Sequence, residues 1–309
     1  MLSRVAERIY WLARYLERAE DTSRLILVRH NATLDMPRSV QPDWEMILDV
    51  LSANEDFAKR PGAANEKNIL GFVFSDRDSP SSIISSLAAA RENMRTSREV
   101  LPSEAWERVN SLYLSVARRA NKGLPRASRH SVLNGVIASS QQIAGLLSGS
   151  MNQDEAYQFI RLGRNLERAD MSTRIIQVAS TDLLGAAEET LPYQNVLWMN
   201  VLQSLSAYQM YRLSMRNNVN PGDVLTFLLR SRDFPRAIAR CLLELEASIK
   251  LLPRGNEALK SVQSVRRKLT RTSVDDLEGE ALHRFLDSLQ VKLNTVDETI
   301  RATWFSPEQ

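Results

Sequence analysis

An internal repeat in the 309-residue chain is the strongest constraint on its fold. When residue 1 is laid on residue 151, 10 of the 26 positions compared are identical. A second match follows at an offset of 155, where Phe72, Arg77, Asp78, Pro80 and Ile83 meet Phe227, Arg232, Asp233, Pro235 and Ile238. Two matches in the same order predict a duplicated unit of roughly 150 residues. We expect the halves to be residues 1–150 and 151–309.

The spacing of apolar residues indicates helices along most of the chain. Val5, Ile9, Leu12, Leu16, Ala19 and Ile26 form one stripe, which predicts a helix from residue 2 into the low thirties. Further helices are predicted at about 43–58, 65–75, 80–101, 104–121 and 130–149. With only 11 glycines and 11 prolines, the chain lacks the turns of an all-β protein. We expect an all-α bundle of about twelve helices, built from two pseudo-symmetric halves that pack as one intertwined body.

Charged residues recur between the two halves at least as faithfully as apolar ones. Glu17 recurs as Glu167, and the arginines that recur are Arg14, Arg18 and Arg24, as Arg164, Arg168 and Arg174. We favour a structural interpretation, in which the two long helices pack across a pseudo-twofold axis and the glutamates accept hydrogen bonds from arginines. Ala13 and Gly163 are small enough to let a neighbouring helix approach. In the functional alternative, the arginines bind a carboxylate or phosphate.

A different cluster of polar residues occurs in the first half only. It consists of Arg91, Glu92, Asn93 and Arg95, and the second half does not retain it at the 155 offset. Arginines on one side of a helix are suited to binding a phosphate or an acidic peptide. We favour the alternative interpretation, a solvated helix face with ordinary Glu–Arg pairs.

The stretch Leu16-Glu-Arg-Ala19, repeated at Leu166-Glu-Arg-Ala169, resembles the bacterial Alpha-E family, an all-helical domain with a Glu-Arg motif. The resemblance extends over nearly the whole chain and includes residues 89–95, 205–211 and 233–236. Gln153 departs from the arginine that we expect the family to favour. Members of the family occur beside, or fused to, a circularly permuted ATP-grasp ligase, often with a transglutaminase-like protease. The resemblance therefore implies these two partners and a role in ATP-dependent peptide or amide ligation.

Three functions agree with these observations. The leading hypothesis is an accessory or amide-processing component that binds a peptide or acidic substrate through the Arg/Glu clusters, while ATP and magnesium bind the partner ligase. The second is a non-catalytic helical scaffold or interaction protein. The third is a stand-alone amide-bond enzyme that uses Glu17 and Glu167 as a general acid/base pair. The sequence leaves open whether the chain is an enzyme, and it leaves the oligomeric state open.

Other kinds of chemistry are poorly represented in the sequence. His30, His130 and His283 have no metal-ligand spacing, and Cys241 is the single cysteine, so we expect no metal site. Glycine-rich phosphate loops are absent, so we expect no cofactor on this chain. The 40 basic residues are interleaved with 37 acidic ones, which argues against a nucleic-acid interface. We expect no membrane span, and we expect the protein in the cytoplasm.

Overall fold

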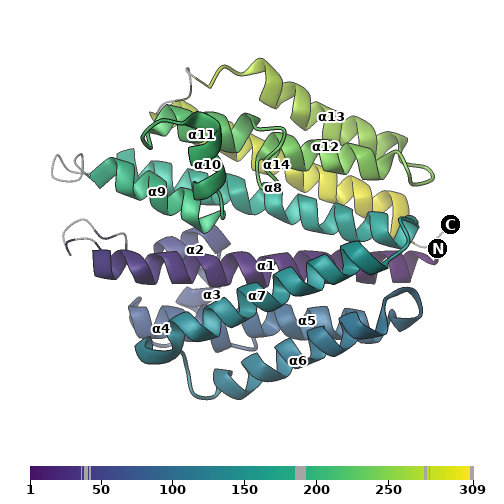
Figure 1. Cartoon of the computed structure of the whole chain (residues 1–309), viewed down its shortest axis with the longest axis horizontal. Coiled ribbons are helices and arrows are strands. Elements are labelled where there is room, and N and C mark those ends of the chain that lie inside the picture. Colours follow the sequence, from purple (N-terminus) through teal and green to yellow (C-terminus); the bar gives the residue numbers. More distant parts are fainter. Residues whose placement is uncertain are drawn as a thin grey trace. The chain divides into compact units, whose positions relative to one another are not determined.

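The computed structural model describes residues 1–35, 37, 41, 43–184, 193–274, 277 and 279–306, without the side chains of 34–35 and 181–184. Within these ranges the chain forms fourteen α-helices and no strand, which confirms the predicted all-α class (Figure 1). The prediction was about twelve helices, and three of the fourteen have only five or six residues. The contacts divide the chain into two compact units. Unit 1 is Met1–Asn31 with Asp43–Arg164, and unit 2 is Ala32–Pro42 with Asn165–Gln309.

Unit 1 contains the helices of the first half and the beginning of α8. In it, α5 packs against α6 and α6 against α7, and these helices run side by side (Figure 1). The core side of α6 shows why, since Ala105, Val109, Leu112 and Val116 follow helical spacing and are all buried. The helices are α1 (Ser3–Asp35), α2 (Met46–Leu51), α3 (Asn54–Ala58), α4 (Glu66–Leu70), α5 (Ile83–Arg95), α6 (Ser103–Ala120), α7 (Arg126–Ser150) and α8 (Glu155–Leu184).

Unit 2 contains most of α8 and the helices that follow it. Here α11 packs against α12, α12 against α13 and α13 against α14. The buried residues of α13 repeat the spacing of α6, with Ala258, Val262, Val265 and Leu269 on its core side. The remaining helices are α9 (Gln194–Ser204), α10 (Tyr208–Met215), α11 (Pro221–Arg230), α12 (Ile238–Ile249), α13 (Asn256–Arg271) and α14 (Gly279–Trp304).

Three of the predicted helices of the first half are interrupted in the structure. The segment 43–58 is two helices, because Ser52 adopts a left-handed backbone with φ of 50° between α2 and α3. The segment 65–75 begins as α4 and ends as a π-helical turn, Gly71–Ser75. The segment 80–101 is α5 followed by a separate 3-10 turn, Arg98–Val100. These interruptions depend on local backbone geometry, which apolar periodicity does not report.

The two runs of seven helices, α1 to α7 and α8 to α14, share local features in the same order along the chain. Ser52 and Ser206 both have left-handed backbones, with φ of 50° and 54°, and each separates two helices. Asn65 and Asn220 each cap a helix by accepting a hydrogen bond from the backbone N–H three residues later, at 3.0 and 2.9 Å. This order is what a duplicated unit would produce. The duplication, its halves at 1–150 and 151–309 and their pseudo-symmetry stay predictions.

Candidate functional site

The repeated Glu-Arg segments of α1 and α8 are largely buried. Glu17 is 4% exposed and Glu167 is 1% exposed. From residue 16 to residue 27, each position is buried or part-buried in the same way as the position 150 residues later. Arg14 is buried, and Arg18, Arg164 and Arg168 are part-buried. The recurring charged residues are therefore held inside the protein, where each charge needs compensation.

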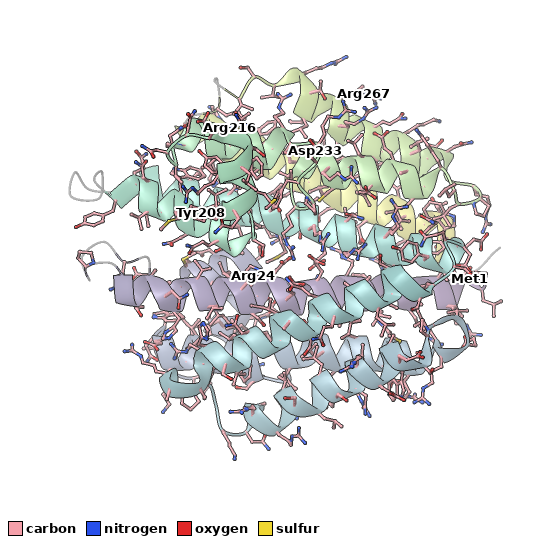
Figure 2. All side chains as sticks on the ribbon, viewed as in Figure 1. Met1, Arg24, Tyr208, Arg216, Asp233 and Arg267 are labelled. Atoms are coloured by element: carbon pink, nitrogen blue, oxygen red, sulfur yellow. The ribbon has the colours of Figure 1, made fainter. Side chains whose placement is uncertain are left out.

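Ion pairs within each helix account for two of the recurring arginines. Arg24 lies 2.7 Å from Glu20 on α1, and Arg174 lies 3.0 Å from Asp170 on α8 (Arg24 is labelled in Figure 2). Sequence reasoning overlooked Glu20, because Glu20 and its counterpart Asp170 are not identical. An acidic residue at the same place in both halves was the available signal.

Glu17 borders a small, partly open space in unit 1. A cavity of about 20 Å³ borders Glu17, Glu20 and Arg164, together with small and apolar side chains of α1, α7 and α8. Such a space holds about one water molecule and no larger group. Glu17 belongs to unit 1 and Glu167 to unit 2, and their role as an acid/base pair stays a prediction.

Gly163 lets α8 approach α1 closely within unit 1. A Cβ atom built on Gly163 would overlap the backbone carbonyl oxygen of Tyr10 and would lie 3.2 Å from the Cβ of Ala13. The predicted close approach beside these small residues is therefore confirmed. It also explains why the α8 counterpart of Ala13 is a glycine.

The predicted cluster on α5 divides between two environments. Arg91 turns toward α6, where its Nε donates to the Oδ1 of Asn110 at 2.7 Å. Its guanidinium also lies over two aromatic rings of α6, with the Cζ 5.6 Å from the centroid of Trp106 and 5.2 Å from that of Tyr113. Arg91 is thus held by packing against the neighbouring helix.

Arg95 has a separate partner on its own helix. Both of its side-chain bonds go to Glu92, at 2.7 and 2.9 Å, and both residues are at least half exposed. The backbone carbonyl of Asn93 accepts a hydrogen bond from Thr96. The structure therefore gives Arg91 and Arg95 different partners, and their action as one anion site stays a prediction.

A second polar cluster in unit 1 joins α1, α4 and α7 around Glu66. Arg126 donates to both carboxylate oxygens of Glu66, at 3.1 and 2.5 Å, and Arg129 lies 2.8 Å from Oε1. Arg129 also lies 3.1 Å from the Nδ1 atom of His30 on α1. The pKa of Glu66 is lowered to about 2, chiefly by the hydrogen bond from Arg126. The hydrogen bond and the positive charge of Arg129 add to this effect, which is larger than the opposing effect of partial burial.

A basic pocket of about 680 Å³ lies beside this Glu66 cluster. Its charged lining residues are Lys67, Lys122, Arg126, Arg129 and Glu66, so four cations surround one carboxylate. Sequence reasoning missed the pocket because its residues come from separate segments and form no motif. Such an excess of positive charge favours anionic ligands.

Substituting Glu66 by glutamine is expected to lower stability at neutral pH. A depressed carboxylate pKa contributes stability above its unfolded value of about 4.5, and this contribution is lost as the pH falls through about 2. The difference in melting temperature between wild type and Glu66→Gln should therefore be largest near pH 7 and shrink toward pH 2. A difference that is independent of pH would contradict the ion pairing.

No helix in the described ranges has the length and apolar character needed to cross a bilayer. The same residues contain no group of three His, Cys, Asp or Glu side chains placed to hold a metal ion.

The chain matches one protein family and is similar to distant relatives of known sequence. The model of the Alpha-E family, described as a predicted alpha-helical domain with a conserved ER motif, matches residues 1–305. Uncharacterized proteins of Mycobacterium bovis and Mycobacterium tuberculosis are 23% identical to the chain over 97% of its length. The match covers 36% of these relatives, so the chain spans about a third of their length. No solved structure matches the chain.

Proposed function

Because the chain belongs to the Alpha-E family, we propose that it is an accessory component of an ATP-grasp-dependent peptide or amide ligation system. It binds a peptide or acidic substrate, while the circularly permuted ATP-grasp ligase binds ATP and magnesium. A transglutaminase-like protease is the second proposed partner. The relatives support a role beside other domains, since this domain makes up about a third of their length.

The basic pocket of unit 1 is the observation that carries this proposal. Its one carboxylate, Glu66, is already bound by two arginines. Lys67 and Lys122 are exposed and add positive charge that this carboxylate does not balance. Carboxylates of an acidic peptide would supply that balance, and attraction between unlike charges also speeds association.

Charge reversal in the pocket tests the proposal. We expect Lys67→Glu/Lys122→Glu to weaken binding of a hexaglutamate peptide at least about tenfold, which corresponds to ~1.4 kcal/mol. The matched control is Lys250→Glu/Lys260→Glu on unit 2, which makes the same change in charge and should alter the affinity less than about twofold. Isothermal titration calorimetry measures both affinities.

Ligation itself provides the second measurement. Wild-type chain should raise the rate of ATP-dependent amide formation by its ligase, and the pocket variant should not. Equal rates with and without the chain would refute the accessory role, and equal peptide affinity in all variants would refute the pocket.

The scaffold function is favoured by a different observation, the acid–arginine pairs of α1 and α8. Glu20–Arg24 and Asp170–Arg174 have the same spacing and are each largely buried. Buried acid–arginine pairs within one helix serve the fold in structural ion-pair networks. A stand-alone amide-bond enzyme would instead require Glu17 and Glu167 to act together.

A further inference from the structure

Arg29 on α1 is a buried arginine with unpartnered nitrogen atoms. The residue is 6% exposed, and its Nε and Nη1 have no hydrogen-bond partner. These two nitrogens carry three N–H donors. A buried donor without an acceptor destabilises the folded protein, and the penalty is larger for a charged group. Burial accordingly lowers the pKa of Arg29, although the nearby carboxylates of Asp43 and Glu66 oppose this effect.

A second buried guanidinium lies over the same aromatic ring. The Cζ of Arg29 is 4.8 Å from the ring centroid of Trp44, and the Cζ of Arg129 is 5.5 Å from it. Arg129 is 3% exposed, and its Nε likewise has no hydrogen-bond partner. The contact with the ring attracts each cation but satisfies none of its N–H donors. Both guanidinium groups therefore contact Trp44, and each has N–H donors without an acceptor.

The predicted duplication places no arginine opposite Arg29 in the second half. Ala179 stands 150 residues after Arg29, and Ser180 stands after His30. The tryptophan itself recurs, because Trp198 precedes the left-handed Ser206 by the same interval that separates Trp44 from Ser52. Trp198 is 3% exposed without an arginine at position 179. Trp44 itself is part-buried, and Trp198 packs without such an arginine, so packing against the ring alone does not explain Arg29.

We propose that Arg29 and Arg129 bind an oxyanion, a carboxylate or phosphate group, beside Trp44. Of the two arginines, Arg129 lines the basic pocket, so the ligand would approach from that side. Guanidinium groups suit such ligands because they offer several N–H donors in one plane. The site is independent of any role in ligation, since it rests on the buried unpartnered donors and their contacts with Trp44.

Thermal unfolding with inorganic phosphate or acetate, against sodium chloride at equal ionic strength, tests the site. We expect at least one oxyanion to raise the melting temperature of the wild type by about 3 °C or more. Arg29→Met should abolish this rise. Its melting temperature without oxyanion should equal or exceed that of the wild type, because an unpartnered buried charge is removed.

The matched control is Arg24→Met, which removes another arginine of α1. Since Arg24 is paired with Glu20, its loss should lower the melting temperature but preserve the rise caused by the oxyanion. If Arg29→Met does not fold, Arg29→Lys serves instead, and its smaller number of donors should reduce the rise. A rise in phosphate alone assigns a phosphate group, a rise in acetate alone assigns a carboxylate, and a rise in both assigns a general oxyanion site.

Two results would overturn this proposal. One is a wild type whose melting temperature responds to phosphate and acetate no more than to chloride. The other is a rise that persists undiminished in the Arg29 variants. Neither result would affect the Lys67 and Lys122 prediction, which is measured with a peptide and with the ligase.

Discussion

Replacing Gly163 by alanine is expected to lower the free energy of unfolding by about 3 kcal/mol, at the upper end of overpacking effects. The added methyl group would overlap the carbonyl oxygen of Tyr10, which belongs to the backbone of α1. A side chain can rotate away from such an overlap, whereas a helix backbone moves only with the helix. The methyl group would therefore push α1 and α8 apart where they pack in unit 1.

Gly135 and Gly145 on α7 provide a matched control for this substitution. A Cβ atom at either position meets nothing within 4 Å. Alanine there should raise the free energy of unfolding by about 0.5–1 kcal/mol, because glycine is the poorer helix former. Urea denaturation of the three variants measures these changes in the free energy of unfolding, which should have opposite signs. A Gly163→Ala variant whose free energy of unfolding is as high as that of the wild type or of the controls would contradict the close approach of α1 and α8.

The long helix α1 shows how much of the fold could be predicted from sequence. Its apolar stripe, its buried glutamate and the close approach beside Ala13 all follow from helical spacing and side-chain size. The interruption at Ser52 could not be predicted in this way. It depends on one residue with a left-handed backbone, and serine does not signal that conformation as glycine does.

The candidate site shows where sequence reasoning stops. Arg129 is separated by 99 residues from His30 and by 63 from Glu66, and only the packing of α1, α4 and α7 brings the three side chains together. Such contacts leave no trace in periodicity or spacing. Arg29 was overlooked for a related reason, since an arginine in a helix attracts notice only when its burial is known.

Breaking the Glu20–Arg24 pair is the second large effect that we expect. Arg24→Met removes the guanidinium that pairs with the carboxylate of Glu20, 4% exposed, and should lower the free energy of unfolding by about 3 kcal/mol. Gln141, which donates to Glu20 at 3.2 Å, would compensate only in part. The double variant Glu20→Leu/Arg24→Met removes both charges and should recover to within about 1 kcal/mol of the wild type.

The exposed pair Glu92–Arg95 is the control, because it joins the same residue types on one helix. Arg95→Ala should change the free energy of unfolding by less than about 1 kcal/mol. If Arg24→Met is equally mild, the buried pair does not support the fold. A different outcome is an Arg24→Met variant that is as stable as the wild type but does not assist ligation. In that case the scaffold function fails, because the recurring arginine acts on a ligand or partner. The third outcome is a large loss of stability in Arg24→Met that the double variant recovers. It would establish that the Glu20–Arg24 pair stabilises the packing of α1. The search for ligand contacts would then move to arginines without buried acid partners, of which Arg29 is the first.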